Sequence, residues 1–161
     1  MSTENVSEAQ IMEALPGLHR ALIDVVSVMN RPERDTALLE LAGLTLERAL
    51  FPLLVLIERL GPIGVVDLAG RVDRDYTTVS RQVARLEELG LVARRPSAAD
   101  RRVREAIITP PGKAATDAVD TARESMALAQ FQAWNAHDFD DLVRLLRRLA
   151  DGMNETPPER S

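Results

Sequence analysis

The chain has 161 residues, enough for one domain, or for one domain with an added oligomerisation element. Hydrophobic residues make up 45% of it and aromatic residues only 3%, so its core must consist mainly of aliphatic side chains. With 20 basic and 25 acidic residues the net charge is −5, and the lack of cysteine excludes disulfides, thiolate metal sites and cysteine redox sensing.

Helices are predicted for the N-terminal segment. Between residues 11 and 29, apolar residues recur at alternating spacings of four and three, which indicates one face of a helix. Pro16 predicts a kink or a restart in this helix, and Pro32 follows its end. A shorter helix is expected over 33–42. We assign residues 1–44 to N-terminal helices that form part of a dimerisation region.

Two further helices are expected before the middle of the chain. Thr45 is a suitable N-cap for a helix that ends before Gly61, and Pro52 predicts a bend or an irregular start in it. Gly64 then opens a short helix over 65–72, whose apolar residues recur at helical spacing.

The segment from Asp75 to Gly90 predicts an amphipathic helix. Asp75 is expected to cap it, and Gly90 provides the left-handed residue that ends such helices. Four apolar residues are predicted to form its buried face: Tyr76, Val79, Val83 and Leu86. A short helix, a turn and a second helix in this order are typical of a helix-turn-helix.

A β-hairpin and two helices complete the chain. Strands are expected over 91–95 and 104–109, joined by a loop over 96–103, and helices over 110–133 and 139–153. The fold class is therefore mainly α with a small β-hairpin wing, a winged helix-turn-helix flanked by N- and C-terminal dimerisation helices. After the N-terminal region over 1–44, we predict a DNA-binding domain over 45–110, dimerisation helices over 111–153 and a disordered tail over 154–161.

Positive charge is concentrated around the helix-turn-helix. Residues 71–104 contain nine arginines and five acids, a net charge of 9 − 5 = +4, so the rest of the chain carries −5 − 4 = −9. A local basic stretch on an acidic chain is the electrostatic pattern expected of a nucleic-acid face. The alternative, a solvated arginine-rich face, does not explain why the cluster coincides with the motif.

The outer face of the 76–89 helix has the residue types that read DNA. Six polar residues are candidate DNA contacts there: Thr77, Thr78, Ser80, Arg81, Gln82 and Arg85. Arginine can donate two hydrogen bonds to guanine, glutamine can pair with adenine, threonine can touch the thymine methyl, and serine suits a phosphate. Glu88 would be repelled deep in a groove, so the helix is expected to tilt away from DNA at its C-terminal end. An amphipathic helix alone would be weak support; the basic hairpin that follows makes the pattern more specific.

The hairpin loop is predicted to be a second DNA contact. Asp100, Arg101 and Arg102 lie there, and an arginine at a wing tip can enter a narrow, A·T-rich minor groove. We expect the Asp100 carboxylate to hold an arginine by a charge-assisted hydrogen bond. Arg94, Arg95 and Arg104, on the strands, are expected to contact phosphates or to support the wing.

With these motifs, the chain resembles the MarR family of bacterial transcriptional regulators. The resemblance covers roughly residues 45–115, and it rests on TVSR, LEELGLV and the wing DRR that precedes IT..GK. It implies a homodimer whose first and last helices interlock and whose winged helices bind a pseudo-palindromic operator. It also implies that Asp100 and Arg102 occupy the wing positions and that 77–85 is the recognition helix. Ser97-Ala98-Ala99 departs from the pattern, because many members have more charge at the wing tip.

The resemblance further implies a small anionic or aromatic effector, bound between the dimer helices and the winged domain, that releases DNA. Four residues are candidates to line such a cleft: His19, Arg20, Arg48 and Trp134. Each has an ordinary alternative, and for Trp134 it is an anchor in the dimer core. The sequence does not decide between these roles.

Together these features predict a sequence-specific DNA-binding regulator, a repressor that binds its operator as a homodimer. The alternative is a winged-helix module for protein interaction or effector binding without specific DNA binding, but that predicts a neutral recognition face, whereas this one carries Arg81 and Arg85. We expect no enzyme, metal or cofactor, because His19 and His137 are far apart and neither lies in a hydrolase or metal motif. The polar first residues and the short apolar run over 49–57 predict a cytoplasmic protein with no membrane partner.

Overall fold

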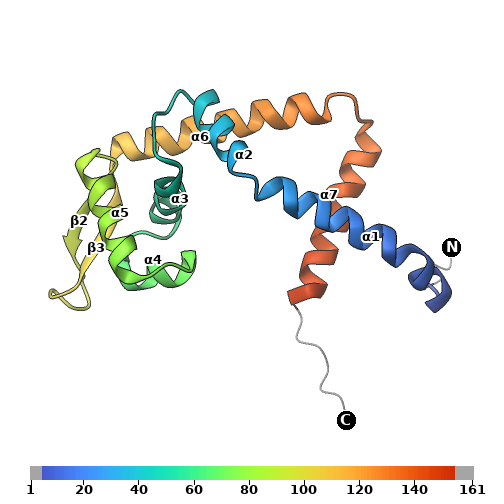
Figure 1. The fold of residues 1–161 in the computed structure, drawn as a ribbon, viewed down its shortest axis with the longest axis horizontal. Coiled ribbons are helices and arrows are strands. Elements are labelled where there is room, and N and C mark those ends of the chain that lie inside the picture. The colour runs from blue at the N-terminus through green and yellow to red at the C-terminus, as the bar shows by residue number, and fades with distance from the viewer. Residues whose placement is uncertain (1–4, 155–161) are drawn as a thin grey trace, which may run out of the picture. The chain divides into compact units, whose positions relative to one another are not determined.

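The computed structural model describes residues 5–154. Along them the elements are α1 (Glu8–Met29), α2 (Pro32–Leu41), a 3-10 turn η1 (Arg48–Leu50), α3 (Phe51–Leu60), β1 (Ile63–Gly64), α4 (Val65–Val72), α5 (Tyr76–Glu88), β2 (Val92–Pro96), β3 (Arg104–Ile108), α6 (Pro110–Phe131) and α7 (Ala136–Asn154) (Figure 1). The predicted fold class, mainly helical with a small β wing, is confirmed. The chain forms two compact units that meet between Ala122 and Arg123, within α6. No helix in the described range is both long enough and apolar enough to cross a membrane.

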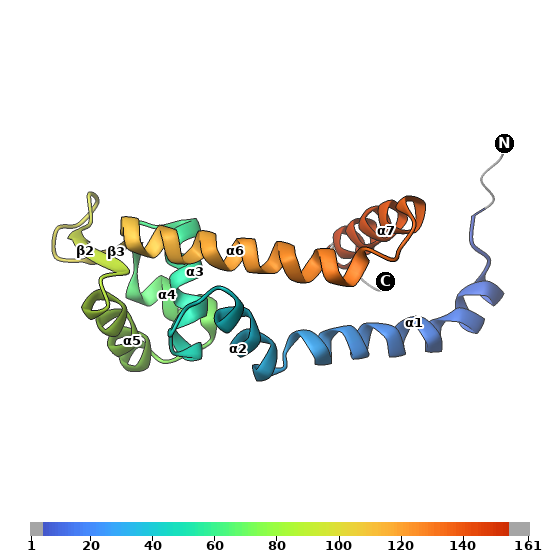
Figure 2. The ribbon, with the colours of Figure 1, turned by 90° about the horizontal axis from the view of Figure 1, so that it is seen from above.

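The N-terminal helix α1 begins with a capping box. The Ser7 side chain accepts a hydrogen bond from the Gln10 backbone N–H at 3.3 Å, and the Gln10 side chain accepts one from the Ser7 backbone N–H at 2.9 Å. The helix continues through Pro16 without a restart, although its N-terminal turns change direction (Figure 2). No residue of α1 is fully buried, so its apolar face is open in the single chain.

The segment that enters the winged domain is irregular, as Pro52 predicts, but Thr45 is not the N-cap. Residues 44–47 have no regular secondary structure, η1 follows, and α3 begins only at Phe51. Pro52 therefore lies in the first turn of α3, where a missing backbone N–H costs nothing. The helix starts later than the apolar pattern indicates because proline is tolerated in a first turn and not in a helix interior.

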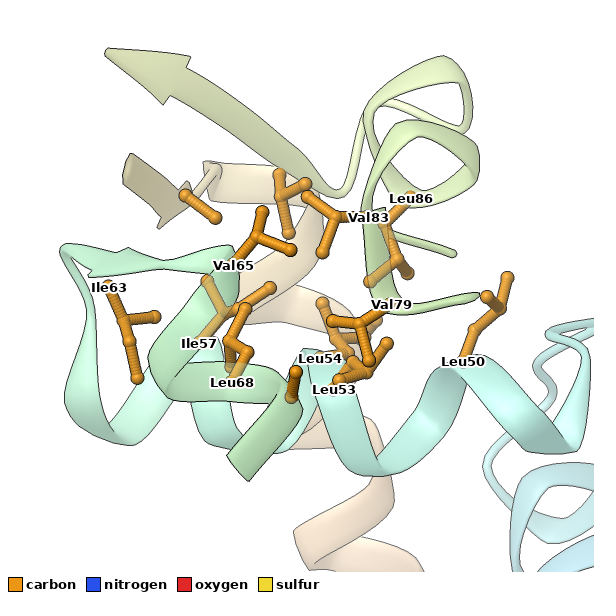
Figure 3. Packing of buried hydrophobic residues seen from close by; sticks show 14 residues of the cluster. Leu50, Leu53, Leu54, Ile57, Ile63, Val65, Leu68, Val79, Val83 and Leu86 are labelled. Carbon is orange, nitrogen blue, oxygen red and sulfur yellow. The ribbon is translucent and has the colours of Figure 1, made fainter. Parts of the chain in front are cut away.

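A single aliphatic core holds the winged domain together (Figure 3). It joins α3, α4 and α5 to the sheet and to the start of α6. Three of the four residues predicted to form the inner face of α5 are completely buried: Val79, Val83 and Leu86. Tyr76 is 57% exposed, so its predicted burial is wrong. It lies about 60° around the helix from Val79 and in the first turn, at the edge of the apolar stripe.

The wing is a three-stranded antiparallel sheet in the order β1-β3-β2. Val92 pairs with Ile108 and Pro96 with Arg104 across the hairpin, and Ile63 of β1 pairs with Ala106 on the other edge of β3. The sequence predicts β2 and β3 but not β1, because a two-residue strand has no periodicity. β1 connects the wing directly to the residues that open α4.

The start of α6 packs closely against the wing. A Cβ added at Gly112 would lie 1.9 Å from the Leu91 carbonyl oxygen, so only glycine fits at this position. Ala115, Val119 and Ala122 continue the buried face of α6.

The C-terminal unit consists of the end of α6 and α7. Asn135 accepts a hydrogen bond from the Asp138 backbone N–H at 2.8 Å, an N-cap that starts α7 at Ala136, three residues before the predicted start. Phe131 packs edge-to-face against Trp134 and Phe139, at ring-centroid distances of 5.3 and 5.0 Å. Of the predicted disordered tail, Asn154 is the last residue of α7 and the others lie outside the described residues.

Candidate nucleic-acid interface

The recognition helix α5 is fixed at its start by a turn and a cap. Asp73 adopts the left-handed conformation, at φ 52° and ψ 47°, that this turn requires. The Asp75 carboxylate accepts hydrogen bonds from the backbone N–H and the hydroxyl of Thr78, at 2.8 and 2.5 Å. These two bonds hold the pKa of Asp75 below its ordinary value, and the bond from the Thr78 hydroxyl has the larger effect. Because the Thr78 hydroxyl donates to the cap, its methyl group is left for any contact with a base.

The outer face of α5 presents its six candidate residues to different degrees. Thr77, Arg81 and Arg85 are exposed, whereas Thr78, Ser80 and Gln82 are half-buried. Among the described residues, no hydrogen bond or ion pair holds the guanidinium of Arg81. Arg81 is therefore the cation on this face that can reach a ligand without breaking an existing contact.

Gln82 has an intramolecular partner that sequence reasoning missed. Arg74, in the turn before α5, donates hydrogen bonds to the Gln82 side-chain oxygen at 3.0 Å and to the Ala49 carbonyl at 2.8 Å. Arg74 thereby links the recognition helix to η1. The amide nitrogen of Gln82 remains available as a donor.

Arg85 lies between two carboxylates. Its Nε is 3.6 Å from Glu47 Oε1 and its Nη1 is 3.1 Å from Glu88 Oε2. A depression of about 320 Å³ opens beside it, lined by Glu47, Leu50, Thr78, Arg81, Gln82 and Arg85. Of the six recognition-helix candidates, Thr78, Arg81, Gln82 and Arg85 thus share one concave surface.

At the wing tip, the expected role of Asp100 is wrong. Its carboxylate accepts a hydrogen bond from the backbone N–H of Arg102 at 3.0 Å, and its carbonyl accepts one from the N–H of Val103 at 3.0 Å. Asp100 shapes the turn instead of holding a guanidinium, because its short side chain reaches the backbone two residues ahead. The side chains of Arg101 and Arg102 are exposed.

A wing arginine supports the hairpin against the recognition helix. Arg94 donates a hydrogen bond to the Ser80 carbonyl at 3.3 Å, and its Nε lies 3.3 Å from Glu87 Oε2. That Nε approaches the carboxylate at ion-pair distance but lacks the geometry of a hydrogen bond. Arg94 is thus a wing support, one of the two roles expected for it. Arg104 donates a hydrogen bond across the hairpin to the Arg94 carbonyl at 3.5 Å, and Arg95 is exposed on its strand.

The four candidates for an effector cleft lie in three separate segments of the chain. His19 and Arg20 are on the exposed face of α1, and Arg48 is the exposed first residue of η1. Trp134 belongs to the C-terminal unit, where it lines an apolar cavity of about 610 Å³ with Phe131, Phe139 and Leu128. Within the first unit, no hydrogen bond or ion pair joins His19, Arg20 and Arg48 to one another among the described residues.

The described residues include no group of three or more His, Asp or Glu side chains placed to hold a metal ion. The chemistry of the outer face of α5 and of the wing is instead that of exposed guanidinium, hydroxyl and amide donors. Such donors suit the phosphate oxygens and base edges of a nucleic acid.

Comparison with known proteins identifies the family. A family model described as the MarR family matches residues 46–103. The chain is 32% identical over 104 residues to the uncharacterized HTH-type transcriptional regulator YxaD of Bacillus subtilis (strain 168). The matched region covers 65% of this chain and 73% of that protein.

Two solved structures show the same fold. A MarR family protein from Bacillus stearothermophilus has a TM-score of 0.71 and 20% identity, covering 94% of this chain and 100% of that one. The transcriptional regulator Tm0710 from Thermotoga maritima has a TM-score of 0.67 and 23% identity, covering 86% and 94%. The winged helix-turn-helix and the match to its family model agree, and the chain belongs to the MarR family of transcriptional regulators.

Proposed function

We propose that this protein binds a pseudo-palindromic DNA operator with sequence specificity and represses transcription. The observation that carries this proposal is the outer face of α5, where Arg81 is exposed and forms no hydrogen bond or ion pair among the described residues. Thr77 lies one turn before it, and the wing adds the exposed guanidinium groups of Arg101 and Arg102. A neutral recognition face would suit an interaction module; this face suits a polyanion with readable base edges.

The region over 45–110 is the DNA-binding domain in this proposal. Affinity comes mainly from arginine–phosphate contacts and therefore falls with salt, whereas specificity comes from the N-terminal turns of α5. Arg102 enters the minor groove beside the half-site. We infer a binding protein and not an enzyme, since the chain belongs to a regulator family, and we place it in the cytoplasm with its DNA target.

We infer that the protein acts as a homodimer through 1–44 and 111–153. The support is the apolar surface that these helices leave open: neither α1 nor α7 contains a buried residue. Ile11, Leu15 and Leu18 on α1, and Val143 and Leu146 on α7, are exposed. An open apolar surface of this kind marks an interface.

We propose that a small aromatic effector controls DNA release, with His19, Arg20, Arg48 and Trp134 as the residues to test. Trp134 is the chain's single tryptophan and lines an apolar cavity, so its fluorescence reports a ligand there directly. Titration with a panel of aromatic acids should change this fluorescence and weaken DNA binding together. A fluorescence change with no effect on DNA binding would contradict an effector role.

Selection of bound sequences from a random DNA pool, near physiological salt, tests the main proposal. We expect enrichment of an inverted repeat whose half-sites lie about one helical turn apart. An enriched single half-site would contradict dimeric binding. Salt-sensitive binding to every duplex, with no enrichment in the absence or presence of the aromatic panel, would contradict operator recognition.

A further inference from the structure

Arg81 and Arg85 lie about one turn apart on α5, yet their surroundings differ. The guanidinium of Arg81 has no hydrogen-bonded or ion-paired partner among the described residues, while that of Arg85 has Glu47 at 3.6 Å and Glu88 at 3.1 Å. With two carboxylates around one guanidinium, the Arg85 cluster carries a net charge of −1. The two carboxylates repel a phosphate that approaches Arg85, because charges a few ångströms apart interact appreciably near a protein surface.

Glu88 is on α5 itself, but Glu47 comes from another part of the chain. It precedes η1, and its segment is held beside α5 by Arg74, which donates to the Ala49 carbonyl at 2.8 Å and to Gln82 at 3.0 Å. These hydrogen bonds therefore position the Glu47 carboxylate beside the outer face of the recognition helix.

The Arg85 ion pairs are exchangeable. The side chains of Arg85, Glu47 and Glu88 are 49%, 66% and 68% exposed. Ion pairs this open to water are weak and contribute little to the stability of the fold. A DNA phosphate can displace Glu47, but the displaced carboxylate then remains beside the phosphate, within the roughly 10 Å over which charges interact at about 0.1 M salt.

We propose that Glu47, together with Glu88, competes with DNA phosphate for Arg85 and so limits the affinity of this protein for duplex DNA of any sequence. This inference rests on the proposed function, because it assumes that α5 faces DNA. It assigns different roles to the two arginines. Arg81 is available to contact a base, whereas Arg85 is a phosphate contact that Glu47 and Glu88 weaken.

Glu47→Gln tests this inference, because it removes the carboxylate charge and keeps the side-chain shape. Dissociation constants are measured for the selected operator and for a shuffled duplex of equal length, between about 50 and about 200 mM salt. We expect both duplexes to bind about three- to tenfold more tightly at the lower salt, with the ratio between them unchanged. The slope of log affinity against log salt should become steeper by up to about 0.9, the value for one added phosphate contact. Glu88→Gln should act in the same direction.

Two controls separate competition from a general gain of charge. Glu40→Gln makes the same change on α2, at an exposed residue with no ion pair in the described range, and should tighten binding less than Glu47→Gln. In the Arg85→Gln background, Glu47→Gln should lose its additional effect. Thermal melts of each variant should match the parent protein, since the residues concerned are exposed.

The possible failures are distinguishable. If the parent protein binds neither duplex, the proposed function fails and this inference fails with it. If it binds the operator but Glu47→Gln is no tighter than Glu40→Gln, or is equally effective without Arg85, the competition is wrong and the proposed function stands. Tightening confined to the operator would make Arg85 a base contact and would also overturn the inference.

Discussion

In the proposed function, sequence-specific readout depends on Arg81. Its guanidinium is exposed on the outer face of α5 and forms no hydrogen bond or ion pair among the described residues, so it can donate two hydrogen bonds to a guanine without breaking either. Arg81→Ala should therefore cost about 1–3 kcal/mol on the selected operator and relax the preference at one base pair. Competition binding and a repeated selection measure both effects. Arg34→Ala, which removes the same charge from α2, is the control; equal losses in both variants would contradict this register of α5.

Asp75 gives the helix start a dependence on pH. Because Thr78 hydrogen bonds hold its pKa below the ordinary value of 3.8, the stability that it contributes is present above that value and is lost as the pH falls through the lower, folded-state pKa. Asp75→Ala should lower the melting temperature at pH 7, and the difference from the parent should shrink as the pH falls below about 4. Asp75→Asn keeps a good cap without a titrating group and is the control. A difference that stays constant down to the lowest pH would contradict the capping role.

At the scale of elements, the junction between the wing and α6 depends on the close contact between Gly112 and the Leu91 carbonyl. The Thr109 hydroxyl donates to the Gly90 carbonyl at 2.6 Å and accepts from the Gly112 N–H at 3.2 Å, which brings α6 against the Leu91 carbonyl. A Cβ at Gly112 would lie 2.7 Å from Ile108 Cδ1 as well as in contact with that carbonyl, so the backbone must shift. Gly112→Ala should destabilise the protein by about 1–3 kcal/mol or more in urea unfolding.

Gly70→Ala is the matched control for this junction. Gly70 lies within α4, and nothing is within 4 Å of a Cβ added there. The same substitution should stabilise the protein by about 0.4–1 kcal/mol, since alanine loses less conformational entropy on folding. If both variants were equally stable, the close packing of α6 on the wing would be wrong.

The helix-turn-helix and its hairpin could be predicted from sequence because their signals are local. Val79, Val83 and Leu86 recur at helical spacing, and Gly90 supplies the positive φ, 74°, that ends α5. Tyr76 continues this spacing, but the pattern does not say where the core ends, and so its exposure could not be predicted. Thr45 fails as a cap for a related reason: Pro52 sets the start of α3 from a position further along the chain.

The contacts within the candidate site could not be predicted, since each joins residues that are distant in sequence. Glu47 meets Arg85, and Arg74 links Ala49 to Gln82, only because the fold brings η1 against α5. Propensity and periodicity contain no information about such pairs. The outward face of α5 was accessible to sequence reasoning, but which of its side chains are free and which are engaged was not.

For the whole molecule, the exposed apolar faces of the terminal helices favour association with a partner. Ile11, Leu15 and Leu18 on α1 are exposed, and leaving such side chains in water costs roughly 25 cal/mol per Å² of apolar surface. We predict a homodimer that persists on dilution to nanomolar concentration, measured by analytical ultracentrifugation with fluorescence detection. A wild-type monomer at micromolar concentration would contradict the predicted homodimer.

A charge placed on this face should dissociate the dimer. Leu18→Asp puts a carboxylate into the apolar stripe of α1, where an unpaired buried charge is strongly unfavourable, and should weaken self-association by at least tenfold. Ser27→Asp adds the same charge to α1 about 180° around the helix from Leu18 and should leave the dimer intact. If each subunit of the proposed dimer binds one half-site, Leu18→Asp should also reduce operator affinity towards that of a single half-site, whereas binding to an isolated half-site duplex should be unchanged. If Ser27→Asp dissociates the dimer as effectively, the interface does not follow the apolar stripe. If Leu18→Asp retains the dimer, the contact between subunits lies outside α1.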